Sequence, residues 1–374
     1  MRKKPYRLKD GAFLLFGIFL LLLLLTNTQL AMDGVRRGIS LCSETLFPSL
    51  FPFLVLSEWM VKKQAGDFLG KYFGKPLSAC LGLSEKGAAS LLLGALCGFP
   101  VGTTTAVAFY ERGEMSKEEL QRLNLCANNP GSGFLIGAVG KALFGNHQAG
   151  ITLFLIVWLS SLLIAVFLRF LYGPIKRIPQ NEMANPQKAP SASDFTTSVK
   201  RAFSSLLQVF SFVIFFSCVS SCLSAILANY KLPAVTGTVL AGILEMTSGI
   251  SHAVTTLSPE NAFRLTAFFV GFAGISICLQ LFAIAEKQKL PMGPYLLAKL
   301  TQGGLALLLA ECYLQLFQPH FEMAQSMATF AQNSTQKMLT AGVCAFFLFS
   351  LLVYIPLAKY TKKHPRAKKK GLSH

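Results

Sequence analysis

Long uncharged apolar stretches recur along the chain and are separated by short polar segments. Most have about 20 residues or more, which at about 1.5 Å per residue lets a helix cross a hydrocarbon core of about 30 Å. Because this core offers no water to bond the backbone, segments that cross it must be helical. The pattern predicts apolar segments at residues 11–32, 41–61, 86–110, 117–144, 148–172, 199–228, 234–257, 261–285, 294–317 and 337–358. The expected fold is therefore an all-α polytopic membrane protein.

Two segments depart from this pattern. Residues 62–83 carry apolar side chains on one helical face with lysines among them, which indicates an amphipathic helix at the membrane interface. Residues 173–198 are rich in Pro, Asn, Gln, Ala and Ser, which indicates a linker between two halves. The predicted organisation is an N-terminal transmembrane helix at residues 1–38, a first repeat at 39–172, a cytoplasmic linker at 173–198, a second repeat at 199–290, two C-terminal transmembrane helices at 291–358 and a basic cytoplasmic tail at 359–374.

The number of crossings predicts that one segment in each half is re-entrant. Three apolar segments lie between two basic loops that are both expected on the cytoplasmic side, and five lie between the linker and the basic tail. An odd number of crossings cannot return the chain to the same side. Segments 86–110 and 234–257 are the candidates for hairpins that enter and leave by one face, because they are interrupted at residues 97–102 and 245–249.

The helices that follow the two hairpins are interrupted as well, at residues 128–133 and 271–276. Their starts match each other without a gap: Ser116, Glu118, Arg122 and Leu123 correspond to Ser258, Glu260, Arg264 and Leu265. The traced path opens the two hairpins toward opposite faces, which predicts an inverted repeat with broken helices, as in secondary transporters. Arg36 and Arg37 do not fit this path, because it places them on the outer side, whereas basic residues are expected on the cytoplasmic side.

Charge and composition narrow the class of protein. Basic residues gather at both chain ends and beside the apolar segments, which places both termini in the cytoplasm. This orientation and anionic lipid explain the net charge of +18, so nucleic acid is not an expected partner. The nine cysteines and five histidines lack the paired spacing of a metal site, so no metal or cofactor is expected. The sequence has no nucleophile elbow, phosphate-binding lysine loop or zinc-protease motif, so no enzyme is expected.

Polar side chains near the breaks are the candidate substrate contacts, because broken helices at membrane depth are tolerated where they line a cavity. The candidates are Thr103, Thr104, Asn128, Asn129, Ser132, Thr247, Ser248, Ser276 and Gln280. For the single Ser and Thr residues, helix packing is the more common explanation. The adjacent amides of Asn128 and Asn129 before Pro130 favour a site.

Glu245 is the candidate ion-coupling residue. It follows the apolar run of residues 240–244, and a carboxylate at such depth is retained mostly for contact with an ion, a proton or a substrate. The structural alternative is a pairing of Glu245 with Arg264 or His252.

Several motifs resemble one known family. The segments Leu46–Glu58, Gly98–Gly102, Asn128–Gly131 and Glu245–Ile250 are similar to those of the sporulation integral membrane protein YlbJ family. Both halves resemble nucleoside-recognition (Gate) domains, which are related to concentrative nucleoside transporters. The resemblance implies two inverted Gate-like repeats and sporulation-linked transport of dipicolinic acid across the outer forespore membrane.

The expected partners are thus a small organic anion, the lipid bilayer and a coupling proton or cation, and a homo-oligomer is compatible with them. Two alternatives to anion transport stay open, a nucleoside carrier and a non-transporting scaffold or assembly factor of sporulation. The polar broken helices favour transport, because a scaffold has no use for unpaired backbone at the membrane midplane.

Overall fold

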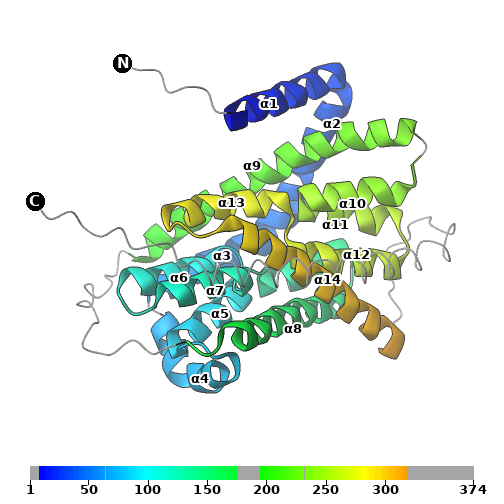
Figure 1. Cartoon of the computed structure of the whole chain (residues 1–374). Helices are drawn as coiled ribbons and strands as arrows, with labels where there is room; N and C mark the ends of the chain where they lie inside the picture. The colour runs from blue at the N-terminus through cyan, green and yellow to red at the C-terminus, as the bar shows by residue number, and fades with distance from the viewer. Residues whose placement is uncertain (1–7, 64, 176–193, 231, 318–374) are drawn as a thin grey trace, which may run out of the picture.

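The computed structural model describes residues 8–63, 65–175, 194–230 and 232–317, which fold into helices without a β-strand (Figure 1). The helices are α1 (Leu8–Thr26), α2 (Thr28–Ser40), η1 (Leu41–Leu46), α3 (Phe47–Lys62), α4 (Ala65–Leu81), α5 (Glu85–Cys97), α6 (Val101–Glu111), α7 (Lys117–Cys126), η2 (Gly133–Leu143), α8 (His147–Tyr172), α9 (Asp194–Asn229), α10 (Ala234–Leu244), α11 (Met246–Thr256), α12 (Pro259–Phe272), α13 (Gly274–Lys287) and α14 (Met292–Phe317).

Five of the described helical stretches are long and apolar enough to cross a membrane, and a bent pair, α4 with α5, brings the number to as many as six. The five are Thr28–Val61, His147–Tyr172, Phe195–Leu227, Pro259–Phe282 and Met292–Phe317. The all-α polytopic membrane fold is therefore confirmed. The predicted segment 337–358, the basic tail and residues 176–193 of the linker lie outside the described residues.

The N-terminal part differs from the prediction. A loop was expected between segments 11–32 and 41–61, but α2, η1 and α3 form one helical stretch, and the chain instead breaks at Asn27. Gly34 and Gly38 pack tightly on α9, since a Cβ at Gly34 would lie 2.7 Å from the Cα of Cys218. The polar residues of this stretch favour a loop, and the close packing on α9 keeps them helical.

Both predicted hairpins are seen as pairs of helices, and their entry and exit by one membrane face stays a prediction. Helices α5 and α6 turn at residues 98–100, and α10 and α11 turn at Glu245. The first hairpin lies toward the left of Figure 1 and the second toward the right, so they approach the centre from opposite sides. Their inverted relation across a membrane stays a prediction.

Each hairpin is followed by a broken helix, as expected. Helix α7 is separated from η2 by residues 127–132, and α12 is separated from α13 by Ala273 in the left-handed conformation (φ 74°). The long helices α8 and α14 come next in the two halves. Their links also match: Arg122 donates to the carbonyl of Gly173 just after α8, at 2.5 Å, and Arg264 donates to Glu311 on α14, also at 2.5 Å.

The predicted amphipathic helix at residues 62–83 is α4. Glycines 66, 70 and 74 form its buried side, and a Cβ at Gly74 would lie 2.9 Å from the carbonyl oxygen of Glu85 at the start of α5. The side chains of Phe68, Tyr72 and Phe73 are more than half exposed. An apolar face turned outward in this way suits contact with lipid.

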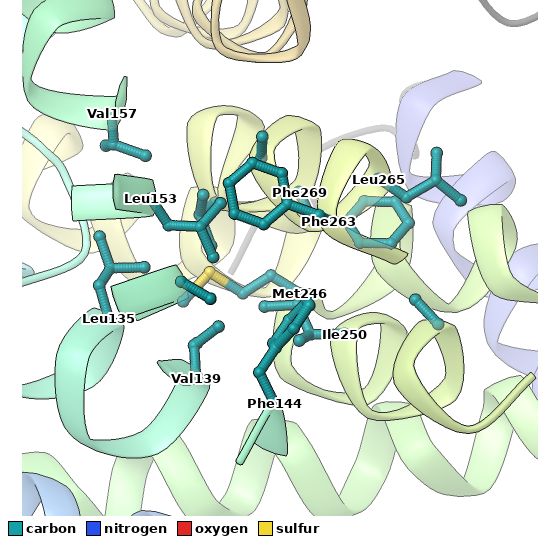
Figure 2. Packing of buried hydrophobic residues seen from close by; sticks show 14 of the residues in the cluster. Leu135, Val139, Phe144, Leu153, Val157, Met246, Ile250, Phe263, Leu265 and Phe269 are labelled. Atoms are coloured by element: carbon teal, nitrogen blue, oxygen red, sulfur yellow. The ribbon is translucent and has the colours of Figure 1, made fainter. Parts of the chain in front are cut away.

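The two halves share a hydrophobic core. Figure 2 shows Leu135 and Leu153 of the first half packed among Ile250, Phe263 and Phe269 of the second. All five side chains are fully buried. The shared core brings the breaks of both halves to one centre.

Candidate functional site

A cavity of about 250 Å³, called here the central cavity, lies where the helix breaks meet. The turn of the first hairpin lines it at residues 98–100, and the second hairpin lines it at residues 245–247. The first hairpin touches its own broken helix: Gly98 has φ 86°, and a Cβ there would lie 2.6 Å from the backbone nitrogen of Gly131. Both hairpins therefore meet broken helices around one space.

Four helices begin at this cavity. They are α6, η2, α11 and α13, and each has residues of its first turn or its N-cap in the cavity wall. The N-terminal end of a helix carries partial positive charge and unpaired N–H groups. Helices α6, η2 and α13 have no hydrogen bond from a capping side chain. The cavity wall thus combines apolar side chains with three electropositive helix ends.

Glu245 caps the fourth of these helices. Its carboxylate accepts hydrogen bonds from the N–H groups of Thr247 (2.9 Å) and Ser248 (2.6 Å), and the residue is 3% exposed. Ionised oxygen atoms at a helix N-terminus are stabilised by the helix dipole and by charge-assisted bonds. Glu245 therefore places a carboxylate in the wall of the central cavity.

The structure gives Arg264 and His252 other partners than Glu245, and the ion-coupling role of Glu245 stays a prediction. Arg264 binds Glu311 at 2.5 Å and Asn261 at 3.1 Å, and the Nδ1 atom of His252 lies 2.6 Å from the Oγ1 atom of Thr238. Neither candidate partner pairs with Glu245.

The other predicted site residues fall into three groups, with Ser248 apart from them. Thr247, Ser276 and Gln280 line the central cavity with Glu245. Two hydroxyls bond backbone carbonyls near the breaks: Ser132 donates to Leu96 at 2.9 Å, and Thr104 donates to Val101 at 3.2 Å.

Ser248 lies behind Glu245, with its Oγ atom 2.7 Å from that of Ser217. Thr103, Asn128 and Asn129 form the third group and are absent from the cavity wall. Thr103 donates to the side-chain oxygen of Asn128 at 2.8 Å, and all three residues are buried.

Asn129 connects the first break to two long helices. Its amide nitrogen donates to Ser161 of α8 at 3.1 Å, and its amide oxygen accepts from Gln302 of α14 at 2.6 Å. These bonds hold the non-helical residues between α7 and η2 in place. The structure thus puts Asn129 in a packing network next to the cavity.

Lys299 on α14 is a central residue that the sequence interpretation missed. It is fully buried, and its Nζ atom donates to the backbone oxygen of Asn128 (2.8 Å) and to the side-chain oxygen of Gln302 (2.7 Å). Its ammonium group also lies 5.8 Å from the ring centre of Phe99 in the first hairpin turn. A single lysine inside the apolar segment 294–317 gives the same signal as Glu245 and could have been found by the same argument.

A metal centre is not evident in the described part of the chain, where no group of three or more His, Cys, Asp or Glu side chains is placed to hold an ion. The polar groups around the central cavity are instead suited to hydrogen bonding and to charge stabilisation.

Comparison with known proteins finds one informative similarity. The chain is 25% identical over 398 aligned residues to the sporulation integral membrane protein YlbJ of Bacillus subtilis (strain 168). The alignment covers 93% of this chain and 97% of that protein, so it extends over both halves. No family model matches the chain, and neither does any solved structure.

Proposed function

We propose, from the assignment of this chain to the YlbJ family of sporulation integral membrane proteins, that it is a secondary transporter of a small organic anion. The assignment rests on a similarity that covers nearly the whole of both chains, together with the apolar helices. Transport is our own inference from the cavity at the helix breaks.

The observation that supports an anionic substrate is the convergence of helix N-termini on the central cavity. Three of the four ends have no hydrogen bond from a capping side chain, which leaves N–H groups of their first turns for carboxylate oxygens, apart from that of Val101, which donates to the backbone oxygen of Gly98 at 2.9 Å. In transporters with broken helices, such half-helix N-termini point at the anionic groups of the substrate. A scaffold protein has no comparable use for this arrangement.

Dipicolinic acid is the substrate that we propose. It is a flat aromatic ring that carries two carboxylates, and the cavity wall offers aromatic rings from Phe53, Phe99 and Phe212 beside the helix ends. The amides of Gln208 and Gln280 lie in the same wall and are able to bond carboxylate oxygens. The volume of about 250 Å³ lies just below the range of about 300–1,000 Å³ for common ligand pockets, which suits a compact ring. The proposed location is the outer forespore membrane.

Glu245 is the proposed coupling residue. While ionised, its carboxylate repels an anion that enters the central cavity, and protonation removes that repulsion. Binding of a proton and binding of the anion therefore favour each other, which is the requirement for coupled transport.

The test is uptake of radiolabelled dipicolinate by proteoliposomes that contain the purified full-length chain, with and without an imposed pH gradient. We expect uptake that depends on the gradient and is competed by unlabelled dipicolinate. Uptake of labelled uridine without uptake of dipicolinate would favour the nucleoside carrier. Uptake of neither would favour the scaffold.

A further inference from the structure

A second and larger cavity of about 880 Å³ lies on the other side of Glu245. Its wall is formed by α2 and η1, by the end of η2 at Leu143, by residues 217–224 of α9 and by the second hairpin, and ten of the seventeen residues that line it are Ser or Thr. A space of this size with so many hydroxyl groups holds water readily. We call it the hydroxyl cavity.

The two cavities follow each other along the same helices. On α9, Phe212 and Val213 line the central cavity and Ser217 and Ser220 line the hydroxyl cavity. The boundary between them spans about one helical turn, or about 6 Å, from Val213 to Ser217. The stretch formed by η1 and α3 repeats this order, since Glu44 belongs to the hydroxyl cavity wall and Leu46 to the central one.

A thin polar layer separates the two spaces. Glu245 faces the central cavity and accepts a hydrogen bond from the N–H group of Ser248, whose hydroxyl lies 2.7 Å from the hydroxyl of Ser217. Both serines line the hydroxyl cavity. The carboxylate of Glu245 and the paired hydroxyls of Ser217 and Ser248 thus lie at the boundary between the two cavities.

Charge distinguishes the hydroxyl cavity from a neutral water pocket. Arg36 and Arg37 lie in its wall with a single carboxylate, Glu44, and with His252. Arg37 is held in place by a hydrogen bond of 2.7 Å to Ser221. Arg36 is paired with Asp33 at 3.2 Å and is therefore partly neutralised. The two arginines outnumber the single carboxylate in this wall, which favours an anion over a cation of the same size.

We infer that the hydroxyl cavity is an aqueous vestibule that admits carboxylate anions to the central cavity, with Arg37 as the residue that selects anions over cations. The contact between Ser217 and Ser248 closes its inner end. The identity of the anion rests on the proposed function, whereas the charge selectivity of the vestibule does not. In this arrangement Arg36 and Arg37 serve substrate entry from within the helical stretch that runs from α2 to α3.

The test measures the charge selectivity of a single thiol in the vestibule. The nine native cysteines are replaced, and Ser251→Cys is introduced into the full chain in lipid nanodiscs. The thiol is treated with two methanethiosulfonates of similar size, one with a sulfonate and one with a trimethylammonium group. The ratio of their rates is divided by the ratio for a free thiol in solution, and we expect it to favour the anion by about tenfold.

Matched variants make the result decisive. Arg37→Gln should lower the rate ratio about fivefold, whereas Glu44→Gln should raise it, because the two changes remove opposite charges from one wall. Leu155→Cys, an exposed apolar position of α8, should react with neither reagent. Ser224→Cys on α9 repeats the measurement from another wall of the vestibule.

No reaction at Ser251→Cys and Ser224→Cys, or a rate ratio that neither charge variant changes, would overturn the vestibule. Slower labelling in the presence of dipicolinate supports both the vestibule and the substrate. Anion-selective labelling that dipicolinate leaves unchanged keeps the vestibule and removes dipicolinate as the substrate, so the two proposals fail separately.

Discussion

The two helix breaks have the same order of elements but opposite chemistry. At the first break, the cation of Lys299 is fully buried and is bonded to Asn128 and Gln302, away from the central cavity wall. At the second break, the carboxylate of Glu245 lies in the cavity wall and is bonded to the start of its own helix. The first arrangement ties α14 to the residues between α7 and η2, and the second leaves an ionisable group facing the substrate space.

This difference separates a structural break from a functional one. A buried group that bonds a distant segment is costly to remove, because its buried polar partners are left unsatisfied. A group that caps its own helix is cheap to replace by a neutral side chain of the same shape. Variants at the first break should therefore lower stability most, and the variant at the second break should change transport with little loss of stability.

Lys299→Met is expected to have the largest effect on stability. It leaves the oxygen atoms of Asn128 and Gln302 buried without their donor, which should lower the free energy of unfolding by about 3 kcal/mol. Thermal unfolding of the purified variant in a single detergent measures this, with Lys287→Met on an exposed position as the control. An unchanged melting temperature would contradict a structural role for the first helix break, because Lys299 would then not be needed for its stability.

Asn129→Ala comes next. The change removes partners from Ser161 and Gln302, and we expect a loss of about 2 kcal/mol in the free energy of unfolding. Uptake of dipicolinate per folded molecule should be largely retained. A normal melting temperature together with lost uptake would return Asn129 to the substrate site and make the two breaks alike.

The matched arginines give a smaller effect. Arg264→Gln should cost about 1.5 kcal/mol, because its bond to Glu311 is largely buried. Glu118→Gln, which removes the exposed partner of Arg122, should cost less than about 0.5 kcal/mol. Chemical unfolding curves of the two variants, measured side by side, test the order. A larger loss for Glu118→Gln than for Arg264→Gln would show that the solvent exposure of an ion pair does not determine its contribution to stability.

Among the variants at the two breaks, Glu245→Gln should have the smallest effect on stability and the sharpest effect on transport. A Gln side chain keeps one acceptor for the helix start, so the loss should be below about 1 kcal/mol. Uptake in proteoliposomes should lose its dependence on the pH gradient. Glu286→Gln, on an exposed position of α13, is the control. A variant that melts early and transports normally would assign Glu245 to structure.

The sequence predicted the breaks because their signals are local. Glycine and proline at residues 98–100 and a carboxylate at Glu245 interrupt apolar runs, and interruptions of this kind are visible without knowledge of the fold. The helix from α2 to α3 was missed for the opposite reason. Polar residues favour a loop, and only the close packing of Gly34 on α9 keeps that stretch helical.

The hydrogen-bond partners of the polar side chains could not be predicted from the sequence. Asn128 and Asn129 were recognised as residues of a break, but their partners Lys299 and Gln302 are more than 170 positions away. Periodicity within one segment carries no information about such a pairing. The same limit applies to the hydroxyl cavity, whose wall joins residues of four separate helical segments.

The bond from Lys299 to Asn128 also sets an order of events during synthesis. The two residues are 171 positions apart, so at about 5–20 residues per second the ribosome needs roughly 10–30 s to make the second after the first. Throughout that interval the first break is in the growing chain without its cation, and its carbonyl oxygen needs another donor. The packing of the first half is thus completed only by a side chain from the second half of the protein.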